Sequence, residues 1–563
     1  MPTLADLVQR NYRAAPQKTA LILQHAGQDD LSISYAQLVA GSAQYAQTYA
    51  RQGIQPGEVV VLILQHGQEL VYSFWGAILY GAVPAIMPFL TEKLSPERYR
   101  ADLSALVATT KPAAIVTYPE FEQDVRNALE AAAEAENPVR SVIVTGQTDP
   151  QTHPDFGTLP GLQRSPEDIV LLQHSSGTTG LQKGVALSHQ AVLNQLDAYT
   201  NALRLTPDDV IVSWLPLYHD MGLIAGFLMP VLMGNPLVLM SPFDWVRAPY
   251  RLFQAVSRYK GTLSWLPNFS YNFCAQKTRE RDLEGVDLST WRIITNCSEP
   301  VKKESHQAFY ERFKSYGLRE TALQCSYAMA ENVFAVTQTD LDSPPITDEL
   351  DREAYMTQRV AASPVDGRPT IRMMSSGKPL PNTRIRILDE KGHDLPDRTI
   401  GEIALQSDCM LTGYYHRPDA TQKAFADGWY LTGDYGYTLN GEVFVAGRKK
   451  DMIIVAGKNV YPQDLEILAY EVPGIHPGRA VAFGIFDEKA GTEEAVIVVE
   501  VDTDDADERQ RIADALRQHI TKNSAIALRH SYIVGKQWIL KTSSGKTARS
   551  ANREKFLQET GFA

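Results

Sequence analysis

The chain has 563 residues, of which 44% are hydrophobic and 21% charged, a composition typical of a globular protein with a large core. Acidic residues outnumber basic ones by 66 to 54, and the formal charge of −12 argues against a nucleic-acid partner. The four cysteines, Cys274, Cys297, Cys325 and Cys409, form no C-x-x-C pair. Neither a zinc site nor a disulfide framework is indicated, and we expect a cytoplasmic protein.

Two N-terminal features bear on membranes. The first residues lack a long apolar stretch behind a basic start, so no secretory signal is expected. The apolar run 71–90 is long enough to span a bilayer, but Gly81 and Pro84 interrupt it. We therefore expect a buried helix followed by an extended segment, and no integral membrane association.

The order of apolar patterns predicts an α/β protein. From about residue 35 to 336, β-branched runs alternate with helical patterns, which indicates two parallel sheets covered by helices. From 382 to 445, short strands and turns indicate an antiparallel, barrel-like subdomain. A smaller α+β segment follows. We predict a large domain over 1–447 and a small one over 448–563, with a polar stretch at about 339–370 that shows no periodicity.

The stretch LLQHSSGTTGLQKGVALSH, residues 171–189, is the first candidate site. Such Ser, Gly and Thr runs are often linkers. Here, however, a strand pattern precedes the run and a helical pattern comes after it, as at the carboxyl end of a sheet strand, where ligands bind. Its hydroxyls, glycines and lysine suit phosphate, although the spacing is not that of nucleotide hydrolases. The other Gly-Lys-Thr match, at 545–547, has Leu540 where the first glycine should stand.

Five further segments make this loop specific. They are SWLPLYHDMGLIAG (213–226), CSYAMAE (325–331), WYLTGDYG (429–436), GRKKDMIIVAGKNVYPQDLE (447–466) and LKTSSGKTARS (540–550). In this order the chain resembles the adenylate-forming superfamily of acyl-CoA synthetases, nonribosomal adenylation domains and luciferases. The resemblance implies that a carboxylate attacks the α-phosphate of ATP and releases pyrophosphate, which requires cations and donors where charge develops.

The resemblance also implies roles for single residues. Lys546 matches the lysine that a mobile small domain inserts between carboxylate and α-phosphate, and His219 matches a residue at the entrance for the acyl carboxylate. Lys450 matches the hinge between the two domains. Read without the resemblance, these would be a tail lysine, a core histidine and a solvated basic run.

Other residues would hold the nucleotide and its metal. The resemblance implies that Glu331 and Thr179 ligate Mg²⁺, that Asp434 accepts hydrogen bonds from the ribose, and that Arg448 assists the nucleotide. Alone, Glu331 reads as a surface or capping residue and Asp434 as part of a turn. The expected ATP contacts are Ser175, Ser176, Gly177, Thr178, Thr179, Gly180, Lys183, Ser298, Glu299, Pro300, Ser326, Tyr327, Ala328, Met329, Asp434 and Arg448.

The acid to be activated carries no amino group in our interpretation. Amino-acid-activating relatives pair the substrate ammonium with the carboxylate of a Phe-Asp motif, because an unpaired buried charge is costly. Here Phe243-Asp244 lies far downstream of the corresponding segment, and Asp220 is the nearby substitute. Apolar residues that suit an alkyl chain, although ordinary core would look similar, are Trp214, Pro267, Asn268 and Phe269.

Several details narrow the resemblance to fatty acyl-AMP ligases. These are PLYHDMGLI, VLMSPF, LPNFSYNFC, NCSEPV and HPGRAVAFGI, together with the segment DELDREAYMTQRVAASP between Tyr327 and Gly377. The segment matches an insertion that in these ligases hinders the domain rotation needed for thioester formation with CoA. The acyl group would then pass to the phosphopantetheine thiol of an acyl carrier protein. Departures from the pattern are His174, Gln182 and Ala328.

Two alternatives stay open. One is a long-chain fatty acyl-CoA synthetase, which would use CoA as the acceptor. The other is a catalytically silent nucleotide-binding or carrier-protein scaffold. The joint presence of Glu331, Asp434 and Lys546 argues against the second.

Overall fold

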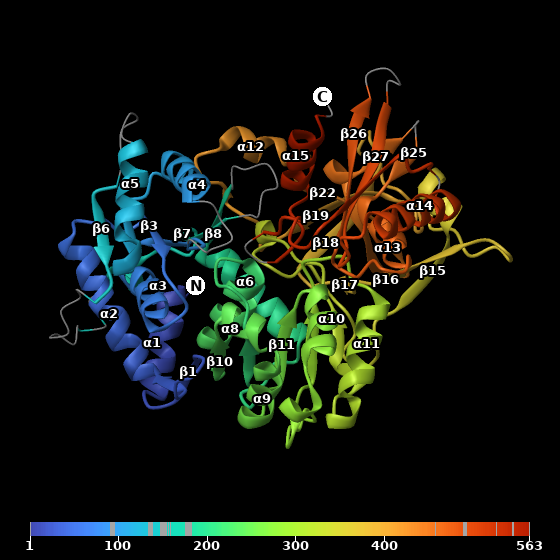
Figure 1. Ribbon diagram of the computed structural model, residues 1–563. Helices are drawn as coiled ribbons and strands as arrows, with labels where there is room; N and C mark the ends of the chain where they lie inside the picture. Colours follow the sequence, from blue (N-terminus) through green and yellow to red (C-terminus); the bar gives the residue numbers. More distant parts are fainter. Residues whose placement is uncertain are drawn as a thin grey trace.

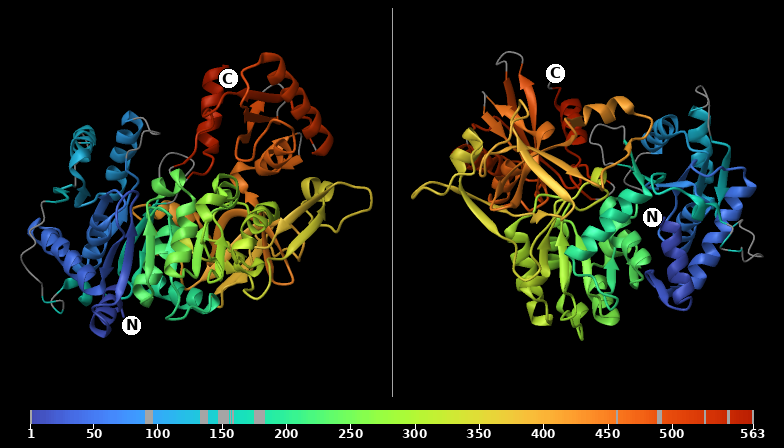
Figure 2. Two further views of the ribbon diagram at one scale, coloured as in Figure 1. Left: turned by 60° about the horizontal axis from the view of Figure 1, so that its bottom comes forward. Right: turned by 180° about the vertical axis from the view of Figure 1, so that it is seen from behind.

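The computed structural model describes residues 2–89, 96–132, 139–146, 155, 157, 159–174, 183–455, 458–487, 492–524, 526–542 and 545–561. Two large sheets with their helices make up the N-terminal part, and a β-rich part leads to a smaller C-terminal segment, drawn in orange and red in Figure 1. The predicted α/β class is confirmed. The second view in Figure 2, turned about the vertical axis, shows the same arrangement from behind.

The first sheet has seven strands in the order β13-β12-β11-β9-β10-β1-β2. Its pairs are parallel except β1 with β2. The short central strands are buried throughout, which agrees with their mostly apolar sequences. The strands are β1 (Thr19–Gln24), β2 (Leu31–Ser34), β9 (Ile211–Ser213), β10 (Leu237–Met240), β11 (Leu263–Leu266), β12 (Ile293–Asn296) and β13 (Leu323–Cys325).

The second sheet also has seven strands, in the order β20-β8-β7-β4-β3-β5-β6. Its members are β3 (Val59–Ile63), β4 (Val83–Ile86), β5 (Ala114–Thr117), β6 (Ser141–Val144), β7 (Ile169–His174), β8 (Gly184–Ser188) and β20 (Gly413–Tyr414). The sequence predicted purely parallel sheets, but β7 pairs antiparallel with β8. β7 ends at His174 and β8 begins at Gly184, so the segment between them is shorter than the dozen or so residues that a parallel crossover needs.

Helices cover both sheets, as predicted. They are α1 (Leu4–Ala14), α2 (Tyr35–Arg51), α3 (Gln68–Tyr80), α4 (Pro96–Thr110), α5 (Glu122–Ala132), α6 (His189–Ala202), η4 (Met221–Leu228), α7 (Met229–Met233), α8 (Pro242–Arg247), α9 (Tyr250–Tyr259), α10 (Asn268–Lys277) and α11 (Lys303–Phe313). The apolar run divides as expected, because α3 ends at Gly81 in the left-handed conformation and β4 follows. No helix in the described ranges is both long and apolar enough to span a membrane.

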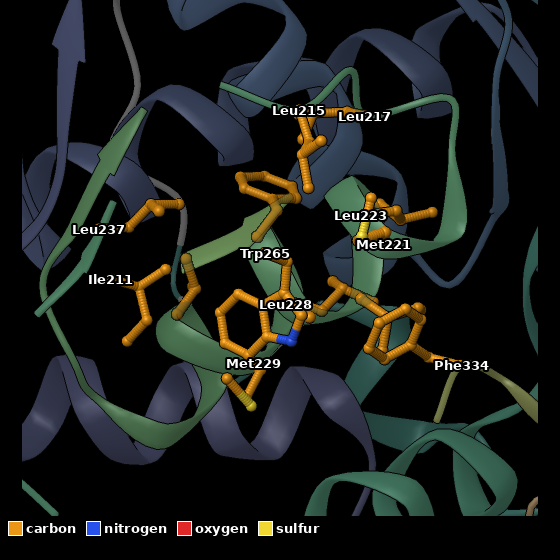
Figure 3. Packing of buried hydrophobic residues seen from close by; sticks show 14 of the residues in the cluster. Ile211, Leu215, Leu217, Met221, Leu223, Leu228, Met229, Leu237, Trp265 and Phe334 are labelled. Atoms are coloured by element: carbon orange, nitrogen blue, oxygen red, sulfur yellow. The ribbon is translucent and has the colours of Figure 1, made fainter. Parts of the chain in front are cut away.

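One apolar core joins the two sheets. Figure 3 shows its centre, where Trp265 of β11 lies among Leu215, Leu228 and Met229. The indole N–H of Trp265 donates to the Tyr199 hydroxyl at 2.8 Å, so its polar atom is satisfied inside the core. The segment after β9, which carries the expected active-site residues, therefore packs against this core.

The barrel-like part is confirmed as an antiparallel sheet. Its strands are β18 (Thr383–Leu388), β19 (Gly401–Ser407), β21 (Phe425–Ala426), β22 (Trp429–Leu439) and β23 (Glu442–Arg448). The order is β18-β19-β22-β21, with β23 also on β22. Residue Asp434 faces Arg448 across the last pair, which brings two expected nucleotide residues together.

The stretch 339–370 has more structure than its sequence suggested. Between the short paired strands β14 (Thr337–Gln338) and β17 (Lys378–Pro379), strands β15 (Thr347–Asp351) and β16 (Thr370–Met374) form a hairpin that encloses η9 (Ala354–Gln358). Leu350, Tyr355 and Met356 are buried in one cluster with residues of the C-terminal segment. This apolar partner is remote in sequence, so local periodicity could not reveal it.

The C-terminal segment begins after the short helix η10 (Lys449–Asp451). It contains β24 (Ile453–Val455), β25 (Lys458–Val460), α13 (Pro462–Tyr470), β26 (Ala480–Asp487), β27 (Thr492–Glu500), α14 (Ala506–Asn523), β28 (His530–Val534) and α15 (Arg549–Thr560). The predicted strands and long helix of this segment are confirmed. The division into domains at residues 447 and 448 stays a prediction.

Candidate active site

A three-residue chain joins the C-terminal segment to the large sheets. The Nζ atom of Lys546 lies 3.0 Å from Nε2 of His219, and Nδ1 of that ring lies 2.6 Å from Oδ1 of Asp220. One ring nitrogen of His219 therefore faces the lysine and the other faces the carboxylate. Two residues that are 327 positions apart in sequence thus meet through one hydrogen bond.

The turn that carries Lys546 is held tightly. Residue Gly545 has φ of +85°, a conformation that favours glycine. The Lys546 N–H donates to the Thr542 hydroxyl at 3.1 Å, and the Thr542 N–H donates to the Lys546 carbonyl at 2.7 Å. This closed turn fixes the direction in which the lysine side chain leaves the backbone.

Burial and the nearby carboxylates have opposite effects on the pKa of Lys546. Burial lowers the pKa of Lys546, whereas the carboxylates of Asp220 and Glu299 raise it. Burial alone would raise the pKa of Asp220, but His219 and Lys546 outweigh it and hold that pKa below its ordinary value. The hydrogen-bonded series therefore has the ionised carboxylate of Asp220 at one end and the amino group of Lys546 at the other.

An aromatic wall lies beside this chain. We define it as Trp214, Trp245, Phe269 and Phe273. The indoles of Trp214 and Trp245 stack with centroids 3.6 Å apart, and the Phe269 ring stands edge-on to both at 6.3 and 6.2 Å. A Cβ atom on Gly545 would lie 3.4 Å from the Phe269 ring, so the Lys546 turn rests on this wall.

The two residues before Phe269, Pro267 and Asn268, were also expected to suit an alkyl chain. Asn268 is buried, and its Oδ1 accepts from the Asn296 side chain at 3.0 Å and from the Lys302 N–H at 3.2 Å. Pro267 precedes α10 as its N-cap residue. The Phe269 N–H donates to Glu299 at 2.9 Å, and burial raises the pKa of that carboxyl. Asn268 and Glu299 thus tie the loop 296–302 to the start of α10.

A second cluster lies where the barrel-like sheet meets β13. The Tyr327 hydroxyl donates to Asp434 at 2.6 Å, and Nε of Arg448 lies 3.7 Å from the other carboxylate oxygen. Burial raises the pKa of Asp434, although Arg448 and Tyr327 favour its ionised form. Ser326 next to it donates its hydroxyl to the Thr337 carbonyl at 2.7 Å. Three residues expected to bind the nucleotide, Tyr327, Asp434 and Arg448, therefore lie in one cluster.

Glu331 lies next to the lysine of the glycine-rich loop. The Tyr414 hydroxyl donates to Oε1 of Glu331 at 2.9 Å, and Nζ of Lys183 lies 4.4 Å from the centroid of the same tyrosine ring. Burial raises the pKa of Glu331, which means that its ionised form needs a cation nearby. One carboxylate with phosphate and water oxygens suits Mg²⁺, whereas the described residues contain no group of three or more side chains able to hold a metal alone.

The remaining predicted residues are placed as follows. Lys450 is an exposed residue of η10, and Ser298, with φ of +71°, and Pro300 lie in the loop before α11. Ala328 bridges to Ala335, and the Met329 N–H donates to the Phe334 carbonyl at 2.8 Å. Outside the described residues lie Ser175, Ser176, Gly177, Thr178, Thr179 and Gly180.

Sequence reasoning did not assign roles to Trp245, Tyr414 or the Asp220 contact. The adjacency of His219 and Asp220 was a usable signal for the last, because neighbouring His and Asp residues can form a hydrogen-bonded pair. Trp245 lies on the short helix α8, and Tyr414 lies on β20. Nothing in their local sequence indicates which side chain they meet in the fold.

The sequence from residue 8 to 415 matches the family model described as AMP-binding enzyme, which covers more than half of the chain. The chain belongs to this family. Within it, the chain is 31% identical to the long-chain-fatty-acid–AMP ligase FadD32 of Mycobacterium marinum over 90% of its own length and 86% of the relative's. It is 29% identical to the medium-chain-fatty-acid–[acyl-carrier-protein] ligase JamA of Moorena producens, over 99% and 95% of the two chains.

A solved structure also resembles this AMP-binding enzyme along its whole length. It comes from studies of fatty acyl-adenylate ligases from E. coli and L. pneumophila, and it is 28% identical, with a TM-score of 0.89 and coverage of 100% of this chain and 99% of that one. The resemblance drawn from the motifs is thereby confirmed.

The Asp220 contact yields a test that needs no substrate. Because the charge of Asp220 raises the pKa of Lys546, Asp220→Asn should shift the half-labelling pH of Lys546 to a lower value. Competitive labelling of amines followed by peptide mass spectrometry measures this pH. The exposed Lys541 serves as the control and should label alike in both proteins. An unchanged Lys546 profile would show that the carboxylate does not act on the lysine.

Proposed function

We propose that this AMP-binding enzyme is an ATP-dependent fatty acid ligase that forms acyl-AMP and pyrophosphate. The observation that carries the proposal is the position of Lys546, which meets His219 while its turn rests on the aromatic wall. The nucleotide cluster of Tyr327, Asp434 and Arg448 supplies the second half of the site. Fatty acid–AMP ligases among the relatives support the same reaction.

The residues suggest how the step proceeds. A carboxylate oxygen of the fatty acid bonds to the α-phosphorus, the bond from that phosphorus to the β-phosphate oxygen breaks, and pyrophosphate leaves with the electron pair. Lys546 donates to the oxygens on which negative charge grows, and the His219–Asp220 pair holds it there. Asp434 accepts from the ribose hydroxyls. Mg²⁺ held by Glu331 and the phosphates would neutralise their charge.

The side chains near the wall favour an acid without an amino group. An ammonium would need a carboxylate partner in this partly buried place. Asp220 already pairs with His219 at 2.6 Å, and Asp244 accepts from the Ala26 N–H at 2.9 Å. The indoles and phenyl rings of the wall offer apolar surface to an alkyl chain instead.

We further propose that the acyl acceptor is the phosphopantetheine thiol of a carrier protein. The insertion packs Tyr355 and Met356 against the C-terminal segment, and the guanidinium of Arg352 donates to the Asn523 carbonyl at 2.8 Å. These contacts would resist the rotation that CoA-dependent relatives use. JamA, a carrier-protein ligase by name, supports this acceptor. An acyl-CoA synthetase is the second candidate, and a relative of Caulobacter vibrioides with that description, 30% identical, favours it.

Pyrophosphate release tests the first half-reaction. The protein with MgATP should release pyrophosphate in the presence of at least one saturated fatty acid in a series of chain lengths. Removing one oxyanion donor costs about 10² to 10³ in rate, so Lys546→Ala should lose this much while its unfolding curve stays unchanged. Lys541→Ala is the matched control, because Lys541 lies on the same loop but is exposed. A Lys546→Ala protein at the control rate would contradict the assigned role.

Acceptor choice tests the second half-reaction. Enzyme purified with bound acyl-AMP should transfer the acyl group to a carrier protein that bears phosphopantetheine. Transfer to CoA at the same concentration should be at least about tenfold slower. Mass spectrometry of both products measures the ratio, and carrier protein without the arm is the control. Equal rates would favour the acyl-CoA synthetase.

The insertion contacts should govern that ratio. The double variant Tyr355→Ala/Met356→Ala removes buried apolar contacts between the insertion and the C-terminal segment. The C-terminal segment should therefore rotate more freely. We expect CoA use to rise while pyrophosphate release is retained. The control is Val365→Ala, an exposed residue of the same insertion. Unchanged CoA use in a folded double variant would show that these contacts are not the barrier.

A further inference from the structure

Tyr414 on β20 is a buried residue that the reaction scheme does not use. Its hydroxyl donates to Oε1 of Glu331 at 2.9 Å, and Nζ of Lys183 lies over its ring, 4.4 Å from the centroid. Glu331 is the expected ligand of Mg²⁺, and Lys183 is the cation expected to meet the phosphates. One tyrosine therefore contacts, through two different parts of its side chain, two charged residues that are distant in the sequence.

Backbone hydrogen bonds hold this tyrosine beside both partners. Strand β20 pairs antiparallel with β8, where Tyr414 lies opposite Val185, two residues after Lys183. At the other end of the same short segment, the Leu411 N–H donates to the carbonyl oxygen of Glu331 at 2.8 Å. The segment thus connects the strand that follows Lys183 to the residue that carries the carboxylate.

A second tyrosine fixes the direction of the Tyr414 hydroxyl. The hydroxyl oxygens of Tyr414 and Tyr430 lie 3.0 Å apart. Tyr414 has one hydroxyl proton, which it donates to Glu331, so Tyr430 is the donor in the bond between the two tyrosines. Both rings are buried in the core that joins the two large sheets. Rotation of the Tyr414 hydroxyl away from Glu331 would break both bonds.

The arrangement keeps two opposite charges from pairing. Within the described ranges of the chain, neither Lys183 nor Glu331 forms an ion pair. The ring face of Tyr414 attracts the ammonium, and its hydroxyl binds the carboxylate. A direct ion pair would instead occupy the carboxylate oxygens that Mg²⁺ requires.

We propose that Tyr414 is a positioning residue of the adenylation site, which keeps Glu331 available to the metal and Lys183 available to the phosphates. Its hydroxyl acts through Glu331, and its ring face acts through Lys183. The inference rests on the proposed function for its kinetic test, whereas its binding test needs no fatty acid.

Nucleotide binding tests the hydroxyl. The probe is α,β-methylene-ATP, in which the bond that the reaction breaks is blocked, and calorimetry measures its affinity with Mg²⁺ or with EDTA. The unaltered protein should bind the probe more tightly with Mg²⁺. Tyr414→Phe removes only the donor to Glu331. It should weaken binding about tenfold with Mg²⁺ and less than about twofold with EDTA, since partners of metal ligands typically contribute about 10- to 100-fold.

The same titration tests the ring face. Tyr414→Leu also removes the ring next to Lys183, so it should weaken binding about threefold with EDTA, where Tyr414→Phe has little effect. Lys183→Gln should show a loss at least as large with EDTA, and it takes the place of Tyr414→Leu if that variant does not fold. Full affinity of either folded variant with EDTA would contradict a role for the ring.

A matched control separates this role from the general cost of losing a buried hydroxyl. The Tyr437 hydroxyl on β22 also donates to a carboxylate, that of Asp348, at 2.9 Å. Tyr437→Phe should therefore bind the probe like the unaltered protein in both conditions. In the Glu331→Gln background, Tyr414→Phe should cause no further loss with Mg²⁺, because the carboxylate is gone.

Three results would overturn the proposal. The first is an affinity of the unaltered protein that does not depend on Mg²⁺. The second is a loss in Tyr414→Phe that is equal with Mg²⁺ and EDTA, or equal to that of Tyr437→Phe. The third is a loss that persists unchanged in the Glu331→Gln background.

Pyrophosphate release provides the kinetic test. The Mg²⁺ concentration for half-maximal release should rise about tenfold in Tyr414→Phe and stay unchanged in Tyr437→Phe. If the unaltered protein releases no pyrophosphate with any acid, the proposed function fails and the binding titrations alone decide the role of Tyr414. An unchanged Mg²⁺ requirement in an active Tyr414→Phe enzyme would overturn the role while the proposed function stands.

Discussion

The proposed chemistry depends on the hydrogen bond between Lys546 and His219. This bond joins a closed turn of the C-terminal segment to the segment that follows β9. The lysine leaves water to make this bond, and burial lowers its pKa, so the nearby carboxylates of Asp220 and Glu299 compensate the desolvated charge. Without this electrostatic support, a cation would not remain between two separate parts of the fold.

Two supports place the rest of the site around that bond. The core beneath η4 and β11 fixes the segment carrying His219, and the aromatic wall continues from this core to the turn at Gly545. On the other side, the pairing of β22 with β23 sets Asp434 opposite Arg448. In the proposed reaction, the aromatic wall would accommodate the acyl chain and the cluster of Tyr327, Asp434 and Arg448 would bind the nucleotide. Such an arrangement would bring the carboxylate of the acid to the α-phosphate.

The sequence predicted the architecture well because the relevant signals are local. Short β-branched runs such as 293–296 became buried strands, and Gly81 and Pro84 divided the long apolar run at the expected place. The antiparallel pairing of β7 with β8 was missed, because periodicity shows that a strand exists but not which way its neighbour runs. Order in the insertion was also missed, since Tyr355 packs against Tyr461, which lies more than 100 positions away.

The motifs predicted Lys546, His219, Tyr327, Asp434 and Arg448 as site residues, and the structure brings each of them into one of two polar clusters. Trp245 and Tyr414 carried no such signal, because their contacts join distant segments of the chain. Isotope transfer tests the central claim most directly. With a fatty acid labelled by ¹⁸O in both carboxylate oxygens, the AMP formed after acyl transfer should carry one ¹⁸O atom, because the attacking oxygen stays on phosphorus. Unlabelled AMP, or label found in inorganic phosphate beside ADP, would contradict attack at the α-phosphate.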